Sequence, residues 1–172
     1  MDCKKCGKCC VNVPMTPAEY RELATRFPAI AAAAIDYGFA VEIHGPCPLL
    51  RADNSCAGYE YRARVCRMFP VTVTGHDGTA ATMAPSPSCP NAGTVTPQDI
   101  DQAKRLNKEF NAEMARSWAE YRATHPDAEQ MAVNFLASRE PARSGAAGID
   151  AGKTLASVID RYSSSLGKRK GK

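Results

Sequence analysis

The sequence predicts an α+β fold, in which an irregular first half with short strands and a hairpin precedes a helical second half. Three observations predict it. All eight cysteines lie within the first ninety residues. The β-branched stretch VTVTGHDGTAATMA, residues 71–84, has the alternation and the central turn residues of a hairpin. Residues 98–123 then run without Pro or Gly and carry apolar side chains at every third or fourth position.

The first helix has a clear start signal. Residues 1–15 are expected to form a cysteine-rich loop, and a helix is expected from Pro17 to about Arg26. Thr16 is the predicted N-cap, Pro17 suits the first helical position, and Glu19 completes a capping box.

Shorter elements are predicted next along the chain. AIAAAAIDYG, residues 29–38, is expected to be a short helix ending at its glycine, and FAVEIHG, residues 39–45, alternates like a strand. Residues 47–56 suggest two strand pieces around an Asp53-Asn54 turn. Residues 59–70 suggest one or two helical turns that end at a proline.

The second half is predicted to be helical and to carry no chemistry of its own. Thr96 begins a helix that reaches Ala123, and a further helix covers 127–138. The first of these helices carries an apolar stripe that is interpreted as core packing: Ile100, Ala103, Leu106, Phe110, Met114, Trp118 and Tyr121.

The predicted organisation has three parts. Residues 1–95 form a cysteine-cluster domain, 96–140 a helical segment packing on it, and 141–172 a basic tail expected to be flexible. Residues 140–148, at the start of the tail, have linker composition, 149–162 suggest a weak helix, and disorder is expected from Ser163.

Composition narrows the setting of the protein. No apolar run is long enough to span a bilayer, and the N-terminus lacks the apolar region of a secretory signal. We therefore expect a cytoplasmic, reducing location with no membrane partner and no structural disulfides. The net charge of +4 is concentrated in the tail, which ends GKRKGK. No aromatic residues interleave with those cations, so a nucleic-acid partner is not expected, and a protein partner stays open.

The cysteines allow three interpretations: disulfides, buried thiols, or metal ligands. The expected reducing location argues against disulfides. Burial as small hydrophobes suits an isolated cysteine, but Cys3, Cys6 and Cys9 stand among lysines at C-x-x-C-x-x-C spacing. Metal ligation fits best, because this spacing turns pairs of sulfurs toward one ion. Gly7 suits the tight turn that follows such a pair.

Eight thiolates need compensation for their charge. Lys4, Lys5, Lys8 and Arg67 are expected to lower the pKa values of the thiols and to offset thiolate charge. The predicted metal ligands are Cys3, Cys6, Cys9, Cys10, Cys47, Cys56, Cys66 and Cys89.

The adjacent cysteines Cys9 and Cys10 raise a question of their own. Neighbouring side chains usually point apart, so Cys10 is expected to face away from Cys9. Two arrangements then stay open: two four-cysteine centres, or one polynuclear centre and a thiol that does not bind metal.

The identity of the metal also stays open between zinc and iron, either mononuclear or as a [4Fe-4S] cluster. The first three cysteines match the start of a bacterial ferredoxin run, but its Cys-Pro is replaced by Val13-Pro14. A remote Cys-Pro occurs at Cys89-Pro90. Four-cysteine zinc sites need only paired spacing. His44 and His76 are additional candidate ligands, although surface positions are the commoner role for such histidines.

The ordered motif resembles the YkgJ-type cysteine-cluster family, with its CxxCxxCC start. The motif runs C-x-x-C-G-x-C-C, then C-x-x-L at Cys47, C-x-x-Y at Cys56, C-R-x-F-P at Cys66, and C-P at Cys89. The resemblance covers about residues 1–90 and implies chelation of zinc or iron. One departure is Arg62-Ala63, where the family often has Arg-Pro. A similar cluster in the flagellin lysine methylase implies a possible enzyme class, but this chain has no large extra domain.

Three functional hypotheses follow. The leading one is a cytoplasmic metal-binding protein that acts in metal handling, scaffolding or electron transfer. The second is a cluster-dependent enzyme, either a redox protein or a protein lysine methyltransferase. The third is an interaction adaptor. The sequence shows no Ser/His/Asp set, P-loop or GxGxxG, and so favours a non-enzymatic role while leaving the catalytic residues unassigned.

Overall fold

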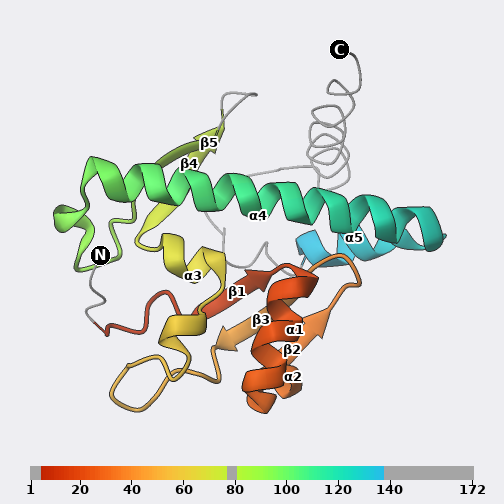
Figure 1. The fold of residues 1–172 in the computed structure, drawn as a ribbon, viewed down its shortest axis with the longest axis horizontal. Coiled ribbons are helices and arrows are strands. Elements are labelled where there is room, and N and C mark those ends of the chain that lie inside the picture. Colours follow the sequence, from red (N-terminus) through yellow and green to blue (C-terminus); the bar gives the residue numbers. More distant parts are fainter. Residues whose placement is uncertain (1–4, 77–80, 138–172) are drawn as a thin grey trace. The chain divides into compact units, whose positions relative to one another are not determined.

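The computed structural model describes residues 5–76 and 81–137 (Figure 1). Contacts along the chain divide it into two compact units, and the boundary falls between Met114 and Ala115, inside the longest helix. The first unit contains every described cysteine. The three-part division expected from the sequence stays a prediction.

A three-stranded antiparallel sheet supports the first unit. Its strand order is β1 (Val11–Met15), β3 (Val41–Pro46), β2 (Ala34–Asp36). Val11 pairs with Pro46 and Met15 with Val41. The loop predicted over residues 1–15 is therefore wrong from Val11 onward, because pairing with β3 makes this segment a strand. Pro14 is tolerated there since β1 lies at the edge of the sheet.

Helix α1 (Pro17–Arg26) confirms the predicted capping box. The Thr16 hydroxyl accepts a hydrogen bond from the Glu19 N–H at 3.2 Å, and the Glu19 carboxylate accepts one from the Thr16 N–H at 3.1 Å. The next helix, α2 (Pro28–Ala33), ends earlier than predicted. Residues 34–36 form β2 instead, because pairing with β3 outweighs the helix propensity of the alanines.

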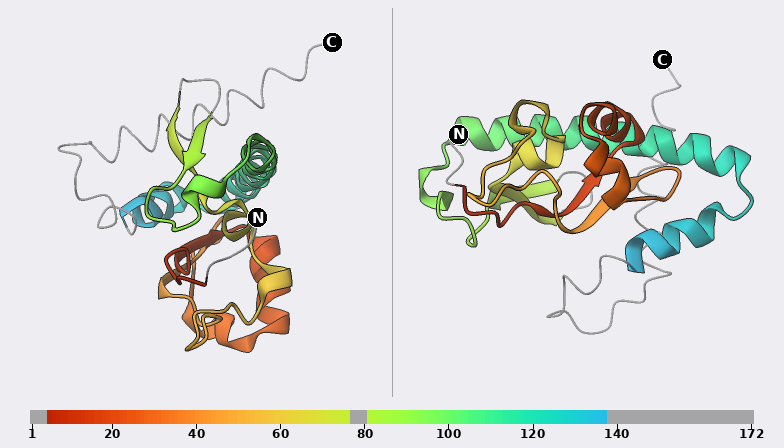
Figure 2. Two further views of the ribbon diagram at one scale, coloured as in Figure 1. Left: turned by 90° about the vertical axis from the view of Figure 1, so that its left-hand side faces the viewer. Right: turned by 90° about the horizontal axis from the view of Figure 1, so that it is seen from below.

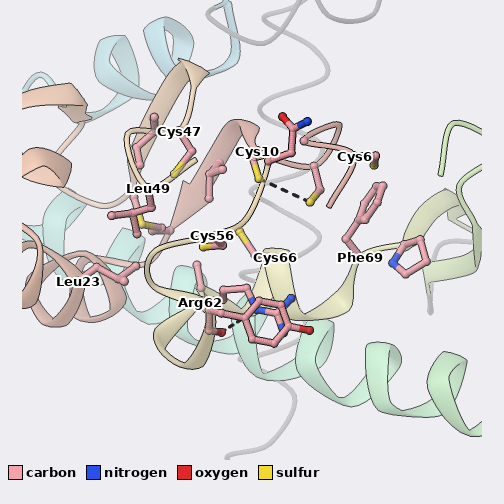
Figure 3. A pocket seen from close by; sticks show the side chains of 18 of the residues that line it. Cys6, Cys10, Leu23, Cys47, Leu49, Cys56, Arg62, Cys66 and Phe69 are labelled. Atoms are coloured by element: carbon pink, nitrogen blue, oxygen red, sulfur yellow. Dashed lines mark hydrogen bonds between the residues drawn. The ribbon is translucent and has the colours of Figure 1, made fainter. Parts of the chain in front are cut away.

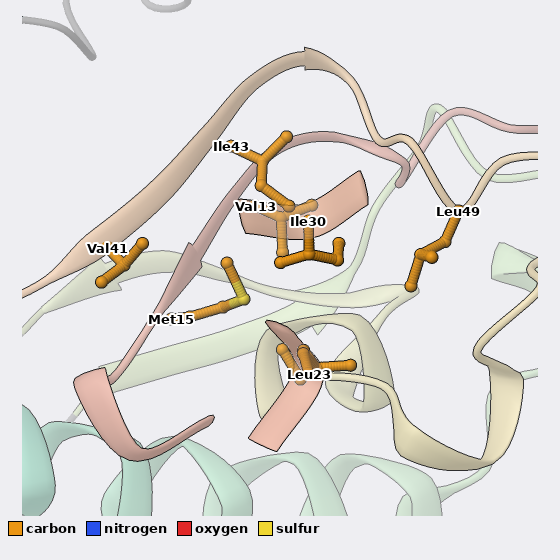
Figure 4. Close-up of a cluster of buried hydrophobic side chains, with 8 residues drawn as sticks. Val13, Met15, Leu23, Ile30, Val41, Ile43 and Leu49 are labelled. Atoms are coloured by element: carbon orange, nitrogen blue, oxygen red, sulfur yellow. The ribbon is translucent and has the colours of Figure 1, made fainter. Parts of the chain in front are cut away.

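The core of this unit lies between the sheet and the two helices (Figure 4). Its buried members come from β1, α1, α2, β3 and the loop after β3: Val13, Met15, Leu23, Ile30, Val41, Ile43, Leu49 and Ala63. Both α1 and α2 contact the sheet and each other (Figure 2). The partly buried Cys47, Cys56 and Cys66 pack against this cluster, so the thiols lie at the margin of the core.

The segment after β3 is mostly irregular. The two strand pieces predicted for residues 47–56 reduce to one bridge between Leu50 and Cys56, but the turn between them is confirmed. There the Asn54 N–H donates to the Arg51 carbonyl at 2.9 Å, with Asn54 at φ 59°. A 3₁₀ turn, η1 (Tyr59–Tyr61), and a short helix, α3 (Arg64–Met68), confirm the predicted helical turns.

The hairpin is confirmed as β4 (Val71–His76) paired with β5 (Ala81–Pro85), and residues 77–80 at its tip lie outside the described residues. A 3₁₀ turn, η2 (Ala92–Thr94), leads to α4 (Pro97–Thr124). A second apolar cluster joins α3, the hairpin and α4, and it consists of Met68, Val71, Met83, Ala103 and Leu106.

The helical second half is confirmed as α4 followed by α5 (Ala128–Ala137). The start at Thr96 is also confirmed, since its N–H donates to the Asp99 carboxylate at 2.9 Å. Every residue of the predicted stripe is at least partly buried. The linker, last helix and basic tail predicted beyond residue 137 lie outside the described residues. Within the described part of the chain, every helix is too short or too polar to cross a bilayer.

Candidate metal centre

Seven cysteines, all that the structure describes, line one pocket in the first unit (Figure 3). They come from the N-terminal loop, the loop after β3, the bridge, α3 and the segment after β5: Cys6, Cys9, Cys10, Cys47, Cys56, Cys66 and Cys89. The cavity has a volume of about 80 Å³. One water needs about 10–15 Å³ by that measure, so the pocket has room for more than one atom.

The sheet brings the first two segments together. Cys10 immediately precedes β1 and Cys47 immediately follows β3, and Val11 pairs with Pro46 at that end of the sheet. The Cys47 N–H continues the pairing by donating to the Cys10 carbonyl at 2.7 Å. Antiparallel pairing therefore places two cysteines side by side although they are far apart in sequence.

The N-terminal loop turns its thiols inward. Gly7 has φ 70°, as the sequence predicted, and its carbonyl accepts the Cys10 N–H at 3.0 Å. The expectation that Cys10 faces away from Cys9 is wrong. Both side chains line the pocket, with their Sγ atoms 3.9 Å apart, because the backbone turns at this pair instead of continuing as a strand.

The remaining described cysteines come from short elements. Cys56 forms the bridge to Leu50, and Cys66 lies in the middle of α3. Cys89 is buried, and its sulfur accepts the N–H of Asn91 at 3.4 Å. No disulfide joins any of the described cysteines. Cys3 lies outside the described residues.

Three thiols of the metal-free pocket, those of Cys10, Cys47 and Cys66, resist ionisation. Burial and the neighbouring Cys9 raise the pKa of Cys10 to about 12. Burial also raises the pKa values of Cys47 and Cys66, and four neighbouring cysteines raise that of Cys66 further. The expectation that nearby cations lower these thiol pKa values is therefore wrong for these three cysteines. Lys5, Lys8 and Arg67 are exposed to water, so desolvation and thiol–thiol repulsion outweigh them.

The sequence did not identify the cation that does line the pocket, which is Arg62. Its guanidinium stacks on the ring of Tyr59 at 3.6 Å, and its Nε donates to the Tyr59 carbonyl at 2.8 Å. Tyr59 lines the pocket as well. The available signal was the motif itself, in which Tyr59 completes C-x-x-Y and Arg62 stands where the family often has the arginine of Arg-Pro.

Sulfur is the dominant donor in the pocket. Among the described residues, no histidine, aspartate or glutamate lines it. His44 instead places its Nε2 3.3 Å from the Glu42 carboxylate on β3. The side chain of His76 lies outside the described residues.

The donor set suits zinc or iron, because both metals bind cysteine thiolates in proteins. As the side chains stand, no three Cys, His, Asp or Glu within residues 5–76 and 81–137 are close enough to hold one ion. Binding therefore requires the thiols to move inward and to lose their protons.

Residues 2–90 match the model of the CxxCxxCC family, described as a "Putative zinc- or iron-chelating domain". The chain belongs to the CxxCxxCC family. The match covers the sheet, α3, the hairpin and every described cysteine of the pocket, and it ends before α4 begins. No curated protein and no solved structure matches the chain.

The loop that carries the CxxCxxCC motif depends on Gly7 for two reasons. Its positive φ is strained for other residues, and an added Cβ would lie 3.2 Å from the Asn54 side-chain oxygen. We predict that Gly7→Ala lowers the free energy of unfolding by about 1–2 kcal/mol, the usual cost of a left-handed residue. Denaturant unfolding of the purified protein measures this.

Two matched variants separate the two causes. Gly45 has φ 75° but no atom within 4 Å of an added Cβ, so Gly45→Ala reports the strain alone. At Gly93 nothing lies within 4 Å and φ is not positive, so Gly93→Ala should cause no loss. Equal losses at Gly7 and Gly93 would contradict the role given to Gly7.

The pocket also predicts the response of the metal-free protein to pH. In the folded state the pKa of Cys10 is raised from 9.0 to about 12, so the unfolded chain releases this proton first. Its contribution to stability is fully present below about pH 9 and is lost as the pH rises toward about 12. Unfolding midpoints of reduced, metal-free protein should therefore fall between about pH 8 and about pH 10.

Cys10→Ser serves as the comparison, because serine does not ionise in this range. Its midpoint should fall less steeply over the same interval, while lysine and tyrosine titrations are shared by both proteins. Parallel curves for the two proteins would show that Cys10 is not the source.

Proposed function

We propose that this chain binds zinc or iron through the thiolates of its cysteine pocket. The convergence of every described cysteine on one cavity is the observation that carries the proposal. These cysteines come from five separate stretches of the chain, so short-range spacing alone does not explain their meeting. Family membership supports the same function.

The proposed ligands are the eight cysteines of the motif: Cys3, Cys6, Cys9, Cys10, Cys47, Cys56, Cys66 and Cys89. Among the described residues the lining is rich in sulfur and has no carboxylate, which suits a thiophilic metal, either as four-thiolate zinc or as iron, including an iron–sulfur cluster. Arg62 at the pocket offsets part of the thiolate charge. A reducing compartment such as the cytoplasm suits such a site, because the ligands must stay unoxidised.

Anaerobic purification of the full chain, followed by metal analysis and an absorption spectrum, tests the proposal. We expect zinc in a colourless protein, or iron with sulfide in a brown one. Combined Cys47→Ser and Cys66→Ser changes should remove metal, whereas His44→Gln should retain it, since His44 contacts Glu42 outside the pocket. A chain without zinc or iron, even after anaerobic reconstitution, would refute the proposal.

The adjacent cysteines allow a sharper measurement. Two sulfurs on one tetrahedral zinc lie about 3.8 Å apart, from Zn–S bonds of about 2.3 Å. The Cys9 and Cys10 sulfurs are already 3.9 Å apart. We therefore predict that both neighbours bind the same centre. Cys9→Ser and Cys10→Ser should lose the same share of the metal, and the double variant should lose no more than either single one.

The test is to measure the amount of metal per chain in the wild type and the three variants, which shows whether Cys9 and Cys10 bind the same centre. Losses that add in the double variant would assign the two neighbours to separate centres, one of the two arrangements that the sequence left open.

A further inference from the structure

The helix that carries Cys66 cannot hold its own position. α3 has five residues, far fewer than an isolated helix needs to be stable in water. Its N-cap residue, Ala63, supplies no side-chain hydrogen bond. The place of the Cys66 thiol in the pocket is therefore set by whatever contacts α3 from outside.

One such contact comes from α1. The Glu19 carboxylate, which already accepts the Thr16 N–H in the capping box, accepts the backbone N–H of Arg64 through its other oxygen at 2.8 Å. Arg64 is the first residue of α3, so Glu19 acts as a remote cap for it. One carboxylate thus satisfies backbone donors at the starts of two helices.

The second contact comes from α4. The Arg64 guanidinium donates to the Glu113 carboxylate through Nη2 at 2.6 Å, while its Nε lies 3.7 Å from Glu19. These side chains are 20%, 17% and 12% exposed for Arg64, Glu113 and Glu19, so water screens them only weakly. A short, charge-assisted bond of this kind fixes both direction and distance.

Apolar packing joins the same helices. Met68, the last residue of α3, packs in one cluster with Ala103 and Leu106 of α4. Val65 packs against both this cluster and the core around the sheet. Figure 1 shows α3 beside α4. The first residue of α3 and its last residue are thus both held by α4, with Cys66 between them.

We propose that Glu113 is a positioning residue for the cysteine pocket: acting through Arg64, it fixes α3 and thereby directs Cys66 toward the other thiols. This inference rests on the proposed metal-binding function. It also assigns α4 to the site, although the family match ends at residue 90 and so does not include this helix. In this chain the metal centre would depend on a segment outside the shared motif.

The test compares Glu113→Gln with Asp101→Asn in the full chain. Asp101 is a matched control on the same helix, with a side chain 64% exposed and an ion pair to Lys104 at the surface. The first readout is the rate at which the purified protein loses its native metal to excess chelator. We expect Glu113→Gln to release metal about tenfold faster, as for other residues that orient metal ligands, and Asp101→Asn to match the wild type.

The second readout separates positioning from general stability. Metal-free protein is alkylated briefly, and the modification of each cysteine is followed by peptide mass spectrometry. In Glu113→Gln, Cys66 should react faster while Cys6, on the N-terminal loop, keeps its wild-type rate. Glu113→Asp retains the negative charge on a shorter side chain, so Cys66 should be alkylated at a rate between those of the wild type and Glu113→Gln. This variant replaces Glu113→Gln if the latter does not fold.

Each outcome has one meaning. Equal behaviour of Glu113→Gln and Asp101→Asn would overturn the inference, and so would equal acceleration at all pocket cysteines. A wild-type protein that holds no zinc or iron would overturn the proposed function, while the alkylation rates would still decide whether Glu113 positions Cys66.

Discussion

The pairing of β1 with β3 is the constraint on which the pocket depends. With Val11 opposite Pro46, the residues just beyond that end of the sheet are Cys10 and Cys47, joined by a backbone hydrogen bond of 2.7 Å. A slip of one residue would turn Val13 and Met15 away from the core and would break this junction. An irregularity between Val11 and Val13 interrupts the pairing, and there the Asn12 side chain accepts the Gly45 N–H at 3.1 Å. Two features therefore fix the register of β1 against β3: the burial of Val13 and Met15 in the core, and the hydrogen bond from Gly45 to the Asn12 side chain.

Local chemistry made part of the fold predictable. Thr16 and Thr96 each bond the N–H of the residue three places on, so the starts of α1 and α4 could be identified within four residues of sequence. The hairpin likewise depends on neighbouring strands and their turn. The strand β1 was missed because its partner β3 is distant in sequence, and β2 because it has only three residues and follows a run of alanines. The alanines before β2 favour a helix on their own, and tertiary pairing overrides that preference.

The same distinction applies to the site. The spacing of the cysteines predicted that they belong together, and the structure brings the seven it describes into one pocket. Spacing could not predict the directions of the Cys9 and Cys10 side chains, which depend on how the loop turns above the sheet. It also could not predict the thiol pKa values. Sequence proximity to lysines suggests stabilised thiolates, whereas the effect of burial appears only once the chain is folded.

Bringing these thiols into one pocket makes the ionisation of some of them unfavourable, and the apolar clusters around the pocket hold the thiols there in spite of this. Burial and the neighbouring thiols raise the pKa values of Cys10 and Cys66, so without metal these two sulfurs favour the neutral form. A bound cation reverses that balance, because it stabilises the thiolates it contacts and displaces their protons. The elements around the pocket must then let the sulfurs move inward when metal replaces their protons. Two apolar clusters, one around the sheet and one between α3, the hairpin and α4, flank the short helix that carries Cys66. The buried members of both clusters are apolar, so they carry no charge that changes when the pocket exchanges protons for metal.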